Sequence, residues 1–199
     1  EIFKNYKVDK ISRNDDNVKI TIGNNFLYYD QVILASHADQ SLKLLNSPSL
    51  DEKRILEKFK YISNLAILHT DENFMPKRKA AWSSWNSLSK NNKTCVTYWL
   101  NNLQNLKTDI NYFLTLNPIN EIKENKIINK VNFAHPYFNS ETLKHQNELS
   151  SLQGKNRTWY CGAYFGYGFH EDGLKSAFNV IKDLVIKFMH LHMLLLHKR

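Results

Sequence analysis

Hydrophobic and polar positions alternate near the start of the chain and predict strands over residues 6–34. The segment 18–22 (VKITI) alternates, Gly23-Asn24-Asn25 supplies a turn, and FLYYD follows. The next run, 31–36 (QVILAS), is continuously apolar, as in a strand that is buried on both faces of a parallel or mixed sheet. A short helix is predicted from about Ala38 to Leu45.

The middle of the chain changes to a helical period and then to several strands. Apolar residues in 51–62 fall at helical spacing after acidic residues in the first turn, so an amphipathic helix is predicted there. A strand follows at 65–70. Short polar loops then separate further apolar stretches, which predict an antiparallel sheet; they are 80–85, 94–100, 111–117 and 130–138.

The last third predicts a helix over 140–152, a strand over 158–163 and a long helix over 173–191. The chain has six glycines, and five of them lie between Gly154 and Gly173. The order strand, glycine-rich loop, helix start is typical of sites where backbone N–H groups and a helix dipole meet an anion or an electron-rich oxygen.

The loop leaves two interpretations open. Gly166 and Gly168 permit positive φ or a close backbone approach, and Asp172 can cap the helix. A dinucleotide fingerprint would need glycine at the position of Glu171, and no phosphate-binding G-K-[ST] is present. The loop is therefore either a ligand site or a tight turn packed with aromatic side chains.

The amino-acid composition narrows the class of protein. The hydrophobic share of 42% and the charged share of 23% are typical of a globular protein. A net charge of +8 favours anionic partners, but no groove-reading motif accompanies it, so no nucleic-acid partner is predicted. Lys77-Arg78-Lys79 is either a solvated loop or a contact for an anionic head group, which leaves peripheral lipid or membrane contact open.

Two cysteines, Cys95 and Cys161, form neither a disulfide framework nor a zinc pattern, and they favour a reducing, cytoplasmic setting. No signal peptide or spanning apolar run is recognised. His190, His192 and His197 suggest a metal site, but the first two diverge on a helix, so no metal binding is predicted. The sequence at Glu1 reads as if it began within a domain, so we expect a fragment of a longer protein.

Three segments carry a resemblance to a known family: YDQVILASHADQSLKLL, DENFMPKRKAAWSSWN and RTWYCGAYFGYGFHEDGLKSA. Together they resemble the C-terminal half of bacterial FAD-dependent oxidoreductases of the flavin-containing amine oxidase superfamily. The resemblance implies a mixed α/β fold: the C-terminal portion of an FAD/NAD(P)-binding Rossmann-like fold, with an inserted substrate domain on a mostly antiparallel sheet.

The resemblance also implies a domain order. Residues 1–38 would form late strands of the FAD-binding domain, 39–152 the substrate domain, and 153–185 the return to the FAD-binding domain with the flavin-proximal loop and helix. Residues 186–199 are a tail of uncertain structure.

FAD is the implied cofactor, and the backbone at the start of the last helix would face the flavin, where it stabilises negative charge. The implied cofactor-binding residues are Val8, Gly162, Ala163, Gly168, His170, Asp172, Gly173 and Leu174. Ala163 departs from the family pattern, because many relatives have an acidic residue there. His37 also follows a strand that crosses between domains and is a further candidate for contact with the cofactor.

Aromatic side chains are the candidates for a substrate pocket, although each of them could equally belong to the core. They are Tyr164, Phe165, Tyr167, Trp82 and Trp99. The catalytic residues are not identified, and flavin dehydrogenation needs no acid–base pair. The predicted function is hydride removal from a C–N or C–C bond of an amine or a lipid-like or isoprenoid small molecule. The alternative is a non-catalytic binding module that keeps the fold, and the chain alone is expected to be inactive as a fragment.

Overall fold

The first strands form an antiparallel meander, because alternating side chains and a glycine turn fix its register. A computed structural model describes the backbone of residues 1–196 and side chains as far as residue 187. β1 (Lys10–Arg13), β2 (Val18–Ile22) and β3 (Asn25–Tyr29) pair in that order, with Ile20 opposite Ile11 and Leu27. Gly23 has a φ of +56° in the two-residue turn between β2 and β3, where a left-handed backbone is needed.

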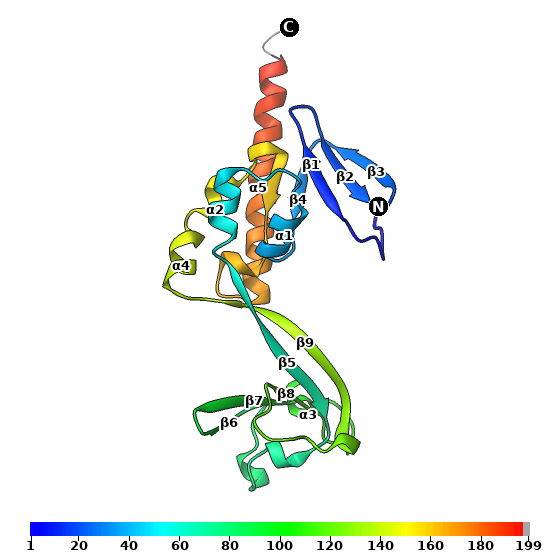
Figure 1. Ribbon diagram of the computed structural model, residues 1–199, viewed down its shortest axis with the longest axis vertical. Coiled ribbons are helices and arrows are strands. Elements are labelled where there is room, and N and C mark those ends of the chain that lie inside the picture. The colour runs from blue at the N-terminus through cyan, green and yellow to red at the C-terminus, as the bar shows by residue number, and fades with distance from the viewer. Residues whose placement is uncertain (197–199) are drawn as a thin grey trace. The chain divides into compact units, whose positions relative to one another are not determined.

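A second, parallel pair of strands joins segments that lie far apart in the sequence. β4 (Val32–Leu34) pairs in parallel with β10 (Thr158–Tyr160), so the predicted strand and its parallel pairing are confirmed. The expected burial on both faces is wrong, because Val32 and Leu34 are buried but Ile33 between them is 43% exposed. The long helix α5 (His170–Leu196) runs next to β4 (Figure 1). Val180 of α5 forms a buried cluster with Trp159 and Cys161.

Short helices complete this part of the chain: α1 (Ala38–Leu44), α2 (Leu50–Leu56) and α4 (Ser140–Gln146). The side chain of Ser49 accepts a hydrogen bond from the backbone N–H of Glu52, and the Glu52 carboxylate accepts one from the backbone N–H of Ser49, so a capping box begins α2. Single 3-10 turns lie at η1 (Glu72–Phe74), η2 (Lys79–Ala81), η3 (Glu124–Lys126), η4 (Leu149–Leu152), η5 (Lys155–Arg157) and η6 (Ala163–Phe165).

The middle segment of the chain forms one five-stranded sheet, in the order β6-β7-β8-β5-β9. β5 pairs antiparallel with β8, which pairs antiparallel with β7, and β6 pairs antiparallel with β7. The antiparallel character predicted for these pairs is therefore confirmed. The strands are β5 (Lys60–His69), β6 (Trp85–Lys90), β7 (Lys93–Trp99), β8 (Phe113–Leu116) and β9 (Ile127–Tyr137), and α3 (Leu100–Leu103) follows β7.

The chain divides into two compact units, and the second is inserted into the first. Unit 1 comprises residues 1–60 and 136–199, and unit 2 comprises residues 61–135. The segment expected as the substrate domain, 39–152, is wider than unit 2, because α1, α2 and α4 belong to unit 1. The mixed α/β fold class is confirmed.

Several predicted elements have other boundaries. The helix predicted to Ile62 ends at Leu56, because Phe59 is buried in the turn that follows and β5 begins at Lys60. The stretch 80–85 is not a strand but mostly a 3-10 turn and loop, and a strand starts only at Trp85. The helix predicted over 140–152 is α4 followed by the 3-10 turn η4.

The tail, whose structure the sequence left open, is helical as far as Leu196, where α5 ends. His197 lies outside the described residues, and so do the side chains of His190 and His192. Within the described part of the chain, no helix is long and apolar enough to cross a membrane.

Candidate functional site

The glycine loop begins where β10 ends and is fastened to the start of α5. The backbone N–H of Gly162 donates to the Ser176 hydroxyl at 2.8 Å, and that hydroxyl lies 2.7 Å from the carbonyl oxygen of Gly173. Because β4 and β10 are parallel, the carboxyl end of β4 lies at the same edge. His37 follows β4 there as the N-cap residue of α1. The structure therefore brings the His37 segment to the same edge as the loop.

Several loop glycines make room for side chains of the protein itself. Gly162 has a φ of +154°, and a Cβ there would lie 2.7 Å from the Tyr164 ring. A Cβ on Gly166 would lie 2.4 Å from the Asp172 carboxyl group. Gly168 has a φ of +92°, and a Cβ there would lie 3.2 Å from the Phe138 ring. The loop is therefore tightly packed against side chains of the protein itself.

Asp172 organises the loop, but it is not the N-cap residue that the sequence predicted. α5 begins at His170, so Asp172 lies inside the first turn. Its carboxylate accepts hydrogen bonds from the backbone N–H groups of Tyr167 (2.9 Å) and Phe169 (3.0 Å). This arrangement is half of a capping box, and it holds the loop against the helix start.

Three backbone N–H groups at this edge have no partner among the described residues: those of Ala163, His170 and Glu171. By contrast, the N–H groups of Asp172 and Gly173 both donate to the carbonyl oxygen of Phe169. Gly173 packs directly on the loop, because a Cβ there would lie 3.6 Å from the Ala163 nitrogen. The start of α5 therefore presents unpaired donors next to the loop, as a binding site for electron-rich atoms requires.

The loop aromatic residues point in different directions. Tyr164 is 2% exposed and its ring meets Phe59 edge to face at 5.3 Å, so it belongs to the core of unit 1. Tyr167 and Phe169 are about two-thirds exposed, and Phe165 is half-buried.

The remaining candidates in unit 1 lie at the surface or on its margin. Leu174 begins an exposed apolar stripe on α5 that continues through Phe178, Ile181 and Val185. His170 is exposed as well, and Val8 is half-buried just before β1.

The two tryptophans predicted for the substrate pocket lie in unit 2, where both form an aromatic cluster. Trp82 and Trp99 meet edge to face at 5.2 Å, and Trp82 also contacts Phe113. Their indole N–H groups are satisfied by the carbonyl oxygen of Pro76 (2.8 Å) and the side chain of Asn111 (3.0 Å). Both are half-buried, so part of each ring faces outward.

A buried histidine next to this cluster was not predicted from the sequence. His69 is fully buried, and its Nδ1 accepts a hydrogen bond from the backbone of Asp71 at 3.1 Å. Its Nε2–H therefore donates to the Thr115 hydroxyl at 2.7 Å, which in turn lies 2.8 Å from the Thr97 hydroxyl. Burial lowers the pKa of His69 to about 4, so the ring is neutral at pH 7.

A buried ion pair in unit 1 also went unrecognised. Arg13 contacts both carboxylate oxygens of Glu52, with Nη2 2.9 Å from Oε2, and the Tyr160 hydroxyl donates to Oε1 at 2.6 Å. Burial alone would raise the pKa of Glu52, but the hydrogen bonds from Arg13, Tyr160 and Ser49 outweigh it and lower that pKa. Burial beside Glu52 raises the pKa of the Tyr160 phenol. The S-x-x-E pattern from Ser49 to Glu52, which is typical of a capping box, was the feature of the sequence that pointed to Glu52.

The described part of the chain shows neither a metal centre nor an exposed thiol. Among the described residues, no group of three His, Cys, Asp or Glu side chains could hold a metal ion. Cys95 and Cys161 are buried free thiols, and burial raises the pKa of Cys161.

Comparisons with solved structures identify the fold. The chain is similar to a fatty acid isomerase from P. acnes that produces CLA (TM-score 0.60, 16% identity, 92% of this chain and 47% of that chain). It is similar to putrescine oxidase bound to putrescine (TM-score 0.60, 9% identity, 92% and 49%). It is also similar to cyclohexylamine oxidase from Brevibacterium oxydans (TM-score 0.52, 9% identity, 90% and 48%).

The chain spans about half the length of these solved structures. No protein-family model matches the sequence, and no curated protein matches it either. The resemblance to flavin-containing amine oxidases is therefore confirmed at the level of the fold.

Proposed function

We propose that this chain forms part of an FAD-dependent oxidoreductase of the amine oxidase type. The observation that carries the proposal is the carboxyl edge of the β4–β10 pair. There, a tight glycine loop and the start of α5 leave the N–H groups of Ala163, His170 and Glu171 without partners among the described residues. In open α/β sheets, ligands bind at the carboxyl ends of parallel strands.

The donor set at this edge fits FAD. The electron-rich edge of a flavin and its ribityl hydroxyls accept hydrogen bonds, and the positive end of a helix dipole favours negative charge. When bound, FAD supplies the hydride acceptor. The chain's own part is to orient and bind: Gly162, Ala163 and Gly173 bring backbone to the ligand, and Asp172 holds the loop in shape.

The remaining predicted contacts belong to this proposal as well. Gly168 and Leu174 adjoin the same loop and helix start, and His170 is exposed at its tip. Val8 is assigned to the cofactor only through the family resemblance. Together these residues would complete the cofactor site.

The proposed reaction is hydride removal from a C–N or C–C bond of an amine or a lipid-like small molecule. The names of the similar structures, two amine oxidases and a fatty acid isomerase, support both substrate classes. Of the pocket candidates, exposed Tyr167 and half-buried Phe165, Trp82 and Trp99 keep surface to offer to a substrate. Tyr164 would act from the core by supporting the loop.

The test is cofactor content. The complete reading frame that encodes this chain is expressed, and the purified protein is scanned for the absorbance bands of oxidised flavin. We expect bound FAD, or reconstitution on adding FAD, and bleaching of those bands by an amine or an unsaturated lipid substrate without oxygen. A protein that neither carries FAD nor takes it up would refute the proposal.

One observation favours a second function, a non-catalytic binding module with the same fold. Ala163 stands where many relatives of the resembled family have an acidic residue, so a hydrogen bond to the ribityl chain is missing from the side chains. This alternative predicts ligand binding at the loop without any bleaching of flavin. The same absorbance experiment separates the two functions.

A further inference from the structure

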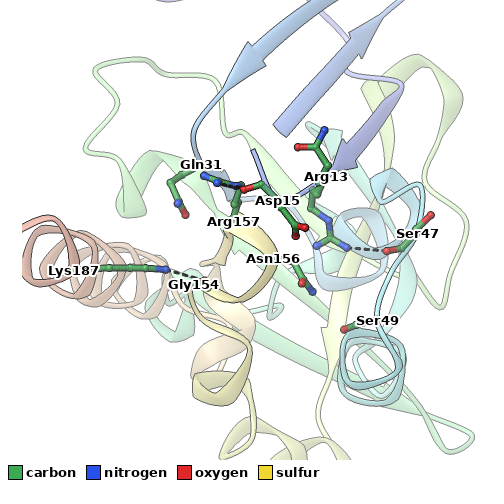
Figure 2. A pocket seen from close by; sticks show the side chains of 10 residues that line it. Arg13, Asp15, Gln31, Ser47, Ser49, Gly154, Asn156, Arg157 and Lys187 are labelled. Carbon is green, nitrogen blue, oxygen red and sulfur yellow. Dashed lines mark hydrogen bonds between the residues drawn. The ribbon is translucent and has the colours of Figure 1, made fainter. Parts of the chain in front are cut away.

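A cavity lies at the edge of the β4–β10 pair opposite to the glycine loop. This cavity of about 700 Å³ is lined by Gln31, which precedes β4, and by Arg157, which precedes β10 (Figure 2). Since the two strands are parallel, these residues lie at their amino ends, whereas the loop follows the carboxyl end. The ten lining residues are polar except for Gly154, so the cavity has no apolar or aromatic side chain in its wall.

Two cations of the lining lack a carboxylate partner. Arg157 donates to the backbone carbonyl oxygens of Asp15 and Asp30, and Lys187 donates to the carbonyl oxygen of Gly154 at 3.1 Å. Neither forms an ion pair within the described part of the chain. Arg13, by contrast, is neutralised by buried Glu52. Asp15 is the one carboxylate of the lining, so positive charge exceeds negative charge there.

Among the described residues, the neutral side chains that line the cavity have hydrogen-bond donors without a partner but few such acceptors. The amide oxygen of Gln31 accepts the indole N–H of Trp159 at 3.0 Å, which leaves the Gln31 NH₂ group without a partner among the described residues. The amide oxygen of Asn14 accepts two backbone N–H groups, so its NH₂ group is left in the same way. The carbonyl oxygen of Ser47 already accepts from Arg13 at 3.0 Å.

The segment that carries Arg157 is held in an uncommon backbone conformation. Gly154, Asn156 and Arg157 all have positive φ, of +68°, +48° and +59°. For residues other than glycine this conformation is costly, and such strain persists where the surroundings enforce it, often at binding sites. Here the carbonyl groups that receive Arg157 and Lys187 fix both cations at the rim of the cavity.

We propose that this cavity binds a small, polar, phosphate-bearing molecule such as a sugar phosphate or a polyphosphate. Phosphate oxygens only accept hydrogen bonds, which matches a wall that has donors and excess positive charge. A volume of about 700 Å³ suits a ligand larger than a single phosphate. The absence of an aromatic or apolar wall disfavours a nucleobase or a lipid tail. The site is separate from the one proposed for FAD and does not depend on it.

The test uses inorganic pyrophosphate as the probe, titrated into the purified protein in a calorimeter at low ionic strength. In Lys187→Gln, we expect affinity to fall about fivefold or more, the usual effect of losing a charge-assisted hydrogen bond. Gln31→Glu keeps the acceptor for Trp159 but replaces donors with a negative charge, so we expect a loss of about tenfold or more. Lys182→Gln is the control, because Lys182 is exposed on the same helix and does not line the cavity.

The outcomes are decisive in both directions. Binding that the two cavity variants weaken and the control leaves within about twofold supports the proposal. No binding, or equal loss in the control, overturns it, because the effect would then be diffuse charge. Loss of the pyrophosphate signal in saturating FAD would place the probe in the cofactor site and overturn a separate pocket. Preference for vesicles that contain phosphatidic acid over free pyrophosphate would indicate a membrane surface and also overturn it.

Discussion

A substitution at Gly173 can separate an effect on cofactor binding from an effect on the stability of α5. A Cβ there meets the Ala163 nitrogen at an ordinary 3.6 Å, so a side chain fits, but the γ-methyl groups of valine would cover the Ala163 N–H. Valine also has a higher helix propensity than glycine, so stability should not fall. In Gly173→Val, we expect an unchanged or slightly raised melting temperature and clearly reduced flavin content.

The control for this variant is Asn179→Val, which introduces the same side chain at an exposed position of α5. It should leave both quantities unchanged. Melting temperature by circular dichroism and flavin content by absorbance are measured on one sample. A normal flavin content in Gly173→Val would contradict the assignment of this edge to the cofactor.

His69 shows how burial couples a single charge to folding. Its pKa is lowered from 6.5 to about 4 in the folded state, so the unfolded chain binds more protons between these values. The contribution of the neutral ring is therefore fully present above pH 6.5 and is lost as the pH falls towards 4, by roughly 2–3 kcal/mol. Urea unfolding of unit 2, followed by tryptophan fluorescence at pH 7.5 and pH 4.5, should show this loss.

The variant His69→Gln removes the titration, and its stability should change less between the two pH values than that of the unsubstituted protein. Exposed His135 lies in the same unit, and His135→Gln should keep the full pH dependence. An equal pH dependence in all three proteins would show that His69 is not the group responsible.

At the scale of elements, the carboxylate of Glu52 links the helix α2 to the strands β1 and β10. Glu52 on α2 binds Arg13 at the end of β1 and Tyr160 at the end of β10, and it is 2% exposed. Removing one partner of a buried ion pair leaves the other charge uncompensated, which costs about 3–5 kcal/mol. We therefore expect Glu52→Gln to lower the free energy of unfolding by about this amount, measured by urea denaturation.

The matched control is Glu57→Gln at the exposed C-cap position of α2, which should change stability by less than about 0.5 kcal/mol. Because the pKa of Glu52 is lowered in the folded state, its contribution is present above the unfolded pKa and is lost as the pH falls through the folded value. The variant should therefore destabilise the protein less in acid than at pH 7. Equal destabilisation by both variants would argue against the buried network.

At the scale of the whole molecule, unit 2 should fold by itself. Its ends lie together, since the side chain of Asn64 is 3.0 Å from Nδ1 of His135, and it has its own core around Ile67, Phe74 and Cys95. Residues 61–135 expressed alone should unfold cooperatively and give a near-ultraviolet tryptophan signal. The segment 50–124, which has the same length but cuts across both units, should remain unfolded. A disordered 61–135 peptide would contradict the division.

Local pattern by itself determined most strands of this protein. VKITI alternates and is β2, the apolar run QVILAS contains β4, and the strands β5, β7, β8 and β9 all lie where apolar stretches were predicted. These predictions hold because strand periodicity and turn chemistry act over a few residues. The glycine loop and the helix after it were also visible in the sequence, as was their place at the end of a strand.

Only the tertiary structure decided where elements end and which charges meet. The helical spacing of 51–62 continued past Leu56, but Phe59 packs against Tyr164 and the chain turns into β5 instead. Asp172 was expected at the helix cap, and the earlier start of α5 makes it reach back over the loop. The Arg13–Glu52 pair spans 39 positions, and the residues that line the cavity come from five separate segments. No local periodicity in the sequence indicates such distant contacts.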